Sequence, residues 1–592
     1  MTDDAMLSVH HGAEADAPRY EAGEDAPARR RPTRLQKSGG RILLIVAGFV
    51  CIYGAILVRL AQFGIAPDQQ YEARRSAQDE IATARPDILD RNGLVLATDI
   101  KVPSLYAEPK KLIDVDEASE LISAVMPDLD AKDLREKLAS KKGFVWLKRE
   151  IKPEQQAQIY KLGLPGIGFM MENKRIYPNG PTLSHVLGSV NIDNQGIAGI
   201  EKYIDNKRGL SDLQALGYVS ASEDMTPLQL SIDLRAQNVM RDELVQGLAH
   251  FKAKAAAGAI MDVNTGEMIS LVSLPDFDPN NPADALDPNK INRVNVGVFE
   301  MGSTFKALTM AMGIESGKFT TNSVLDARSA LHYGHFAISD YHAQRRPLTL
   351  PEVFTYSSNI GTARIALGLG VDAHKAFLKM MGQLDRLVTE LPENAAPIVP
   401  SHWGELNTVT ISFGHGIAVA PLQALMAVGS MMNGGFLIKP TFLMRDKETA
   451  MAGAQDVLKP HTSDVLRYLL RLNAEKGSAK KADIPGLQVG GKTGTAEKVE
   501  NGRYSKTKVF TTFMAVFPFD HPKYLVMALY DEPQGLPETY GYSTAAWNAG
   551  VTTGKIVERV APLLGVAPRF QEIPNNPPPL YAPKDQKVAS SQ

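Results

Sequence analysis

The segment Phe299-Glu-Met-Gly302-Ser303-Thr-Phe-Lys306-Ala-Leu-Thr-Met-Ala-Met-Gly-Ile314 places a serine at the start of an apolar helix. Gly302 lets the chain turn into this helix, and Gly317 can end it. Ser303 and Lys306 are three residues apart, so their side chains lie one turn apart on one helical face. A serine hydroxyl becomes a nucleophile when a base takes its proton, and burial can lower a lysine pKa enough to provide that base. The segment therefore predicts a serine–lysine acyl-transfer site at a helix N-terminus, where backbone N–H groups can stabilise an oxyanion.

Two further motifs raise the specificity of this prediction. Ser357-Ser-Asn359 lies at the edge of a helical pattern, and Lys492-Thr493-Gly494-Thr495 lies in a predicted strand whose glycines permit close approach by a ligand. Each motif is weak alone, because chance matches occur elsewhere in the chain. The order of the three motifs on helix, loop and strand is the specific signal, and it matches a known set of serine acyl-transfer motifs. The chance matches are Ser478–Lys481 and Ser505–Lys508, both expected in solvated loops, together with Ser189–Asn191 and Lys37–Gly39.

Composition excludes several classes of protein. The chain has 592 residues, with 64 Lys and Arg against 66 Asp and Glu, so it lacks the basic excess of a nucleic-acid binder. Its single cysteine, Cys51, excludes an internal disulfide framework and a zinc site built from several cysteines. His332 and His335 are spaced like metal ligands, but no acidic partner with suitable spacing accompanies them, so neither a metal nor a cofactor is expected.

The N-terminal region is strongly patterned in charge. Residues 1–28 contain seven acids and one base, and residues 29–41 contain six bases and no acid, which predicts a disordered tail over 1–41. The apolar run over 42–60 is predicted to be an uncleaved transmembrane signal anchor, with Arg59 directed toward the interface. Because basic flanks stay cytoplasmic, the rest of the chain is expected in the periplasm.

The exported part divides into two predicted domains and a tail. Residues 61–226 form a mixed pedestal, with a strand–turn–strand over 85–97, charged helices over 116–161 and an irregular segment over 188–201. Residues 227–572 form an α/β catalytic domain, whose hairpins over 256–272 and 511–530 have short turns and so predict an antiparallel sheet. Periodicity also predicts a strand over 408–413, and residues 573–592 form a flexible tail.

The motifs resemble those of the class B penicillin-binding proteins, and in particular their division-specific members. The resemblance covers nearly everything after residue 40, and it implies a penicillin-binding-protein/β-lactamase-like transpeptidase domain with an antiparallel sheet flanked by helices. It also implies an elongated pedestal of the dimerisation type and one N-terminal transmembrane helix. The segments that carry it are Arg85–Ala97, Arg175–Pro178, Gly199–Glu201, Ser231–Gln237, Pro275–Asn280, Asn292-Arg293, Phe299–Lys306, Ser412–Gln423, Asp531–Pro533 and Tyr540–Gly550.

The resemblance implies a role for each motif residue. Ser303 is expected to be the nucleophile and Lys306 its general base. Ser357 and Asn359 would pass a proton to the leaving amine and hold the substrate amide, while Lys492 would keep Lys306 neutral. The other expected positions are Thr493, Gly494 and Thr495 for substrate binding, with the backbone N–H groups of Ser303 and Thr495 as the oxyanion hole.

The implied activity is D,D-transpeptidation of peptidoglycan stem peptides during septal wall synthesis at the cell inner membrane, with β-lactams as inhibitors. The implied partners are a membrane polysaccharide polymerase of the FtsW type and other division proteins. An elongation-specific transpeptidase, a D,D-carboxypeptidase or β-lactamase-like hydrolase, and an acylated sensor or scaffold remain alternatives. Glu405 only loosely matches the deacylating glutamate of class A β-lactamases, and His415 is expected to pack behind the active-site wall.

Overall fold

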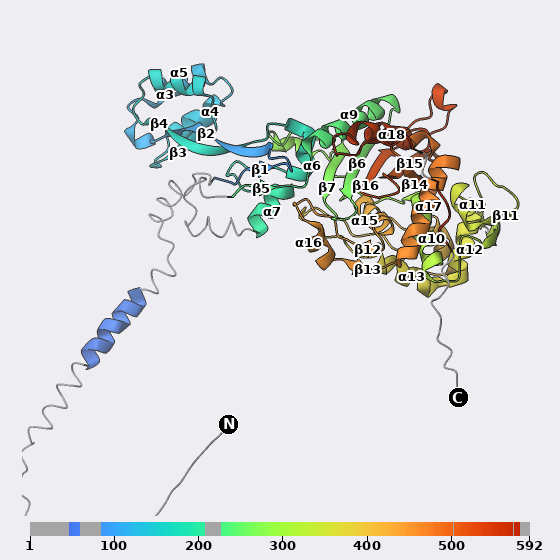
Figure 1. The fold of residues 1–592 in the computed structure, drawn as a ribbon. Coiled ribbons are helices and arrows are strands. Elements are labelled where there is room, and N and C mark those ends of the chain that lie inside the picture. The colour runs from blue at the N-terminus through green and yellow to red at the C-terminus, as the bar shows by residue number, and fades with distance from the viewer. Residues whose placement is uncertain are drawn as a thin grey trace, which may run out of the picture. The chain divides into compact units, whose positions relative to one another are not determined.

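The computed structural model describes residues 46–59, 84–207, 226–334, 336–500, 502–571 and 574–579 (Figure 1). The chain forms two units, residues 1–79 and residues 80–592. In the first unit the described residues form a helix over 46–59. Among the helices that the structure describes, none is both long and apolar enough to cross a membrane. The predicted tail over 1–41 and the ends of the predicted span over 42–60 lie outside the described residues.

The predicted pedestal begins with a hairpin and is built on a small mixed sheet. Strands β1 (Ile88–Leu89) and β2 (Val95–Ala107) pair antiparallel, with Ile88 opposite Ala97. Gly93 in the connecting turn has a φ of 84°, which explains why glycine follows asparagine there and agrees with the expected strand–turn–strand. Strands β3 (Val145–Lys148) and β4 (Ile167–Ile176) both pair antiparallel with β2.

Three amphipathic helices cover this sheet around a small apolar core. Helices α3 (Val115–Val125) and α4 (Ala131–Leu138) start at aspartate caps, and α5 (Pro153–Lys161) starts with proline in its first turn. Their apolar positions pack with those of β2 and β3. The prediction of helices over 116–161 was therefore incomplete, because β3 lies between α4 and α5. Its four residues alternate between buried and half-buried positions, a period that is too short to stand out from the helical pattern.

Buried ion pairs tie the start of the pedestal to its last helix. Arg85 donates to Glu201 at 2.8 Å and to Asp205 at 2.7 Å, and Arg175 donates to Glu201 at 2.7 Å and to Asp99 at 3.0 Å. Both arginines and Glu201 have fully buried side chains. The helices on this side are α6 (Ser184–Leu187) and α7 (Gly199–Lys207). We call the five residues of these ion pairs, Arg85, Asp99, Arg175, Glu201 and Asp205, the pedestal charge network.

The predicted catalytic domain is organised by a five-stranded sheet in the order β14-β15-β16-β6-β7, with every neighbouring pair antiparallel. Short turns join β6 (Ala255–Asp262) to β7 (Met268–Leu274) and β15 (Arg503–Phe517) to β16 (Tyr524–Asp531). These are the two hairpins that the sequence predicts. Strand β14 (Gly490–Glu500) lies at the edge and carries the Lys-Thr-Gly motif.

Helices cover both faces of this sheet (Figure 1). Alternate residues of β6 face opposite cores: Ile260 packs with α9 (Leu234–His250) and α18 (Ala549–Val560), while Met261 belongs to the larger core on the other face. That larger core contains α10 (Lys306–Glu315), α15 (Pro421–Met432) and α17 (Pro460–Lys476). The predicted antiparallel sheet flanked by helices is thus confirmed.

One predicted strand is wrong. Residues 408–413 lie mostly in helix α14 (Glu405–Ser412), which packs against α12 (Asn359–Leu369). The Asn407 side chain accepts from the Gly404 N–H at 3.0 Å and so closes the first turn of α14. Buried residues at helical spacing, including Thr408, Ile411 and Ser412, then favour the helix over the strand.

Shorter elements complete the fold. Strand β5 (Leu228–Gln229) leads into the catalytic domain and pairs in parallel with β1 of the pedestal sheet. The others are η1 (Pro109–Lys111), η2 (Gly180–Leu183), η4 (Pro282–Leu286), η5 (Gly302–Phe305), β8 (Val324–Asp326), β9 (Leu331–Tyr333), β10 (Phe336–Ile338), β11 (Pro347–Thr349), α11 (Leu350–Thr355), α13 (Val371–Met380), β12 (Phe436–Leu437), α16 (Lys447–Ala452), β13 (Gln455–Asp456), η6 (Lys480–Ala482) and η7 (Pro537–Thr539).

Candidate active site

Ser303 lies on a tight turn that is pressed against the edge strand of the sheet. The turn is the 3-10 helix η5, and α10 continues directly from it at Lys306. Gly302 has a φ of 53°, and a Cβ atom there would lie 2.6 Å from the carbonyl oxygen of Thr495. Glycine is therefore required for this approach, which brings the backbone of the Ser303 turn beside the backbone of Thr495.

Two buried lysines converge on one serine hydroxyl. The Lys306 Nζ donates to Ser357 Oγ at 3.0 Å and to the Ser357 carbonyl oxygen at 2.5 Å. The Lys492 Nζ donates to the same Ser357 Oγ at 3.2 Å and to the Thr493 carbonyl oxygen at 3.1 Å. Lys306 is completely buried and Lys492 is 2% exposed. Ser357 is thus the polar link between the helix that follows Ser303 and the edge strand.

Burial and like charge both disfavour the protonated lysines. Burial, together with the charge of Lys492, holds the pKa of Lys306 well below its usual value of 10.5. Burial lowers the pKa of Lys492 to about 7. Among the residues that the structure describes, no carboxylate forms an ion pair with either amine. Both shifts favour a neutral amine, which general-base activation of a hydroxyl needs, and the hydroxyl that both amines contact is that of Ser357.

The Ser-x-Asn loop is held by an aspartate that sequence reasoning did not single out as a site residue. Asp340 accepts from Ser358 Oγ at 2.7 Å and from the Ile360 N–H at 2.9 Å, so it fixes the first turn of α12. Asn359 in that turn donates to the Ser339 carbonyl oxygen at 3.0 Å. The sequence alone does not indicate this role, because no spacing rule connects Asp340 to a helix that starts nineteen residues later.

The Lys-Thr-Gly strand is positioned from both sides. On one side, Asn473 of α17 donates to the Gly491 carbonyl oxygen at 2.7 Å. On the other, a Cβ at Gly494 would lie 2.5 Å from the Met301 carbonyl oxygen, so glycine allows contact with the start of the turn that carries Ser303. The Thr495 hydroxyl accepts from the Ala545 N–H at 3.1 Å.

One supposed chance match lies next to the site. Ser478 was expected in a solvated loop, but its Oγ is 2.8 Å from the Thr493 Oγ1. Its motif partner Lys481 places Nζ 3.8 Å from the centre of the Trp547 ring. The loop prediction is also wrong for residues 505–508, which belong to strand β15.

Hydrogen bonds join four of the predicted site residues, Lys306, Ser357, Lys492 and Thr493, and the turn that carries Ser303 lies against Gly494 and Thr495. Asn359 lies two residues after Ser357, and its side chain donates to the Ser339 carbonyl oxygen. Next to them, burial and the charge of Lys306 lower the pKa of His415 to about 4, in keeping with its expected place behind the wall. Glu405 accepts a hydrogen bond from the Tyr333 hydroxyl at 2.9 Å. His332 is exposed on β9, and His335 lies outside the described residues.

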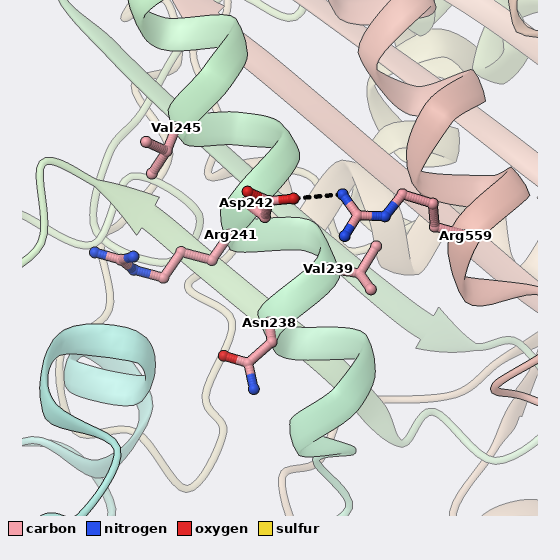
Figure 2. Close-up of a pocket in the computed structure, with 6 residues that line it drawn as sticks. All are labelled: Asn238, Val239, Arg241, Asp242, Val245 and Arg559. Atoms are coloured by element: carbon pink, nitrogen blue, oxygen red, sulfur yellow. Dashed lines mark hydrogen bonds and ion pairs between the residues drawn. The ribbon is translucent and has the colours of Figure 1, made fainter.

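A separate cavity of about 370 Å³ lies on the outer face of α9 (Figure 2). Its charged groups already have partners: Arg559 from α18 donates to Asp242 at 2.5 Å and Arg241 donates to Asp276 at 2.7 Å. None of the predicted site residues lines it. The cavity is therefore not part of the candidate active site.

Comparisons with known proteins agree with this geometry. Residues 256–550 match the penicillin binding protein transpeptidase domain, and residues 80–219 match the penicillin-binding protein dimerisation domain. The chain is 37% identical to the probable peptidoglycan D,D-transpeptidase FtsI of Caulobacter vibrioides over 82% of each chain. It is 29% identical to the peptidoglycan D,D-transpeptidase FtsI of Escherichia coli, over 86% of this chain and 91% of the relative.

A third relative, stage V sporulation protein D of Bacillus subtilis, is 30% identical over 83% of this chain and 80% of its own length. Two matched domains and a relative at 37% identity over most of both chains identify the family. The chain belongs to the class B penicillin-binding proteins, as the motifs predicted.

Proposed function

We propose that this protein is a peptidoglycan D,D-transpeptidase that cross-links stem peptides through an acyl-enzyme on Ser303. The observation that carries this proposal is the Ser357 hydroxyl, which accepts hydrogen bonds from both buried lysines beside the Ser303 turn. The transpeptidase domain and the FtsI-type relatives support the same activity.

In the acylation step, Ser303 Oγ attacks the carbonyl carbon between the two terminal D-alanines of a donor stem peptide. Neutral Lys306 takes the serine proton as the new ester bond forms. The backbone N–H groups of Ser303 and Thr495 stabilise the developing oxyanion. A proton then passes through Ser357 to the leaving amine, the peptide bond breaks, and the terminal D-alanine departs.

The remaining motif residues hold the substrate. The threonine hydroxyls of Thr493 and Thr495 bind the terminal carboxylate, and Gly494 between them lets the strand lie against the Ser303 turn. Asn359 binds the substrate amide, and Lys492 favours the neutral form of Lys306 by charge repulsion. These roles follow from the matched family motifs and from the hydrogen bonds that gather the residues.

Turnover requires an amine from a neighbouring stem peptide. Its nitrogen attacks the ester carbonyl, a new amide bond forms, the bond to Ser303 Oγ breaks, and the amine proton returns to the serine. β-Lactams acylate the same serine and block this second step.

The cellular role that best suits the chain is septal wall synthesis at the inner membrane. The FtsI-type relatives support this role. A membrane polysaccharide polymerase of the FtsW type is the partner that the resemblance of the motifs implies. The apolar sequence over 42–60 supports an N-terminal anchor with the catalytic domain in the periplasm. A fluorescent fusion at midcell, and recovery of the full chain from membranes only with detergent, are the expected results.

Labelling with a fluorescent penicillin tests the catalytic proposal directly. Ser303→Ala should form no covalent adduct, whereas Ser505→Ala, which alters the chance match in β15, should be labelled like the native chain. A donor peptide supplied with an amine acceptor should yield the cross-linked amide. Persistent labelling of Ser303→Ala would refute the nucleophile, and hydrolysis without cross-linking would favour a carboxypeptidase.

A further inference from the structure

The Glu300 carboxyl group, three residues before Ser303, joins the nucleophile turn to two other segments. Its Oε1 accepts from the Gly416 N–H at 2.7 Å and from the Tyr504 hydroxyl at 3.1 Å. Its Oε2 is buried and has no hydrogen-bond partner among the described atoms. Burial also raises the pKa of Glu300, so this carboxyl is held in place at an energetic cost.

Each of the two segments also meets the nucleophile turn at a second point. In the loop over 413–416, the Gly414 carbonyl oxygen accepts a hydrogen bond from the Gly302 N–H at 3.2 Å. In the hairpin formed by β14 and β15, the Phe510 ring stacks on Phe299 with centroids 4.2 Å apart and planes 7° apart. Glu300 therefore adds an attachment on each side of the turn to those that other residues already make.

The loop and the hairpin also contact each other. The ring of His415 lies edge-on to the ring of Tyr504, with centroids 5.7 Å apart. Tyr504 is on β15 opposite Val499, so it belongs to the same pair of strands as Thr495. A closed set of contacts thus runs from Glu300 to Tyr504, to His415, to Gly416 and back to Glu300.

We propose that Glu300 and Tyr504 are positioning residues for acylation, which fix the Ser303 turn against the strand pair that carries Thr495. The two N–H groups of the proposed oxyanion hole come from these two pieces of backbone, so their spacing depends on how firmly the pieces are joined. The inference rests on the proposed role of Ser303. It adds a residue pair outside the three motifs, acting through the position of the Ser303 turn.

The main test compares Tyr504→Phe with Tyr333→Phe. Both variants remove one partly exposed tyrosine hydroxyl that donates to a glutamate, but the Tyr333 hydroxyl binds Glu405 at the start of α14 instead of Glu300. With a fluorescent penicillin, Tyr504→Phe should lower the acylation rate constant at saturation by about three- to tenfold, because small displacements of reacting groups are costly. Its reversible binding constant and melting temperature should stay native. Tyr333→Phe should acylate at the native rate.

Substitutions of Glu300 give a second, graded test. Glu300→Gln keeps an acceptor oxygen for Gly416 and Tyr504, and it should retain more acylation than Glu300→Leu, for which a loss of about 10²-fold is expected. The proposal is overturned if Tyr504→Phe acylates at the native rate or if Tyr333→Phe loses as much. It is also overturned if Glu300→Gln and Glu300→Leu lose activity only as the folded fraction falls. If the native chain were labelled elsewhere than Ser303, the proposed function itself would fail instead.

Discussion

The molecule buries charge in two ways, and the pedestal charge network and the lysine pair of the active site show the contrast. In the pedestal, Arg85 and Arg175 are fully buried and each forms ion pairs with Glu201 and a second carboxylate. In the active site, Lys306 and Lys492 are equally buried, but among the described residues neither forms an ion pair with a carboxylate.

The presence or absence of a paired carboxylate decides whether a buried basic side chain keeps its proton. In the pedestal, the neighbouring carboxylates raise the pKa of Arg175 and the arginines lower the pKa of Glu201, despite the opposing effect of burial. In the active site, burial lowers the pKa of both lysines, and the charge of Asp340, which forms no ion pair with Lys306, opposes the shift at Lys306 without overcoming it. Paired burial therefore gives a fixed structural charge, and unpaired burial gives an amine that can accept a proton at neutral pH.

The largest effect is expected on the acylation rate, when the active site loses Lys306, the proposed general base. Lys306→Ala should lower the acylation rate by about 10³- to 10⁴-fold, or about 4–5.5 kcal/mol in activation free energy. Time-resolved labelling with a fluorescent penicillin measures this rate. Circular dichroism should show a native fold, and an undiminished rate would mean that another group is the base.

Removing the carboxylate of Glu201, which both pedestal arginines share, should lower the stability of the fold instead of the acylation rate. Glu201→Gln leaves two buried guanidinium groups without their common partner, so the free energy of unfolding should fall by about 3–5 kcal/mol. Urea denaturation measures this change. The folded fraction should still acylate at the native rate, and a slower rate in folded protein would show that the two regions are coupled.

The pH dependence of stability distinguishes the two kinds of burial. Between pH 7 and 10.5 the unfolded chain keeps the Lys492 proton and the folded chain does not, so folding becomes more favourable as pH rises. Lys492→Met should be more stable than the native protein near pH 7. That advantage should shrink by at most about 1.4 kcal/mol per pH unit up to about pH 10. A constant advantage in urea titrations across this range would contradict the lowered pKa of Lys492.

The smallest effect is expected for an exposed ion pair in the pedestal. Arg135 donates to Asp116 at 2.6 Å, and both side chains are more than half exposed. Asp116→Asn should leave the urea midpoint unchanged, because solvent screens such pairs. Asp116→Asn is the matched control for Glu201→Gln. A clear fall in its urea midpoint would contradict the expectation that buried ion pairs stabilise this protein more than exposed ones.

The sequence predicts the site better than it predicts the elements around it. The hairpins over 256–272 and 511–530 were predictable because short apolar runs flank turns of a few polar or glycine residues. Ser303, Lys306, Ser357 and Lys492 were recognisable because acyl transfer needs these residue types, and their order along the chain adds specificity. The catalytic roles of these residues stay predictions until the variants are measured.

What was missed depends on contacts between distant segments. Asp340 follows the hairpin of β9 and β10, and Ser478 follows α17. Both reach the site because these segments fold against it, and a local sequence pattern does not indicate such a contact. Helix α14 and strand β3 were misread because each is short, and packing against neighbouring elements outweighs weak local periodicity.

The glycines that bring the nucleophile turn to the edge strand also restrict how this enzyme can change under selection. A side chain at Gly302, Gly494 or Gly414 would collide with backbone atoms of the facing segment, at 2.6, 2.5 and 2.0 Å. A larger residue at Gly302 or Gly494 would separate the Ser303 turn from the strand of Thr495, the two pieces of the proposed oxyanion hole. A larger residue at Gly414 would push the loop over 413–416 away from the Ser303 turn, so β-lactam insensitivity is not expected to arise at these three positions. Adaptive substitutions should therefore accumulate at the rim, where side chains can vary while the backbone contacts stay intact.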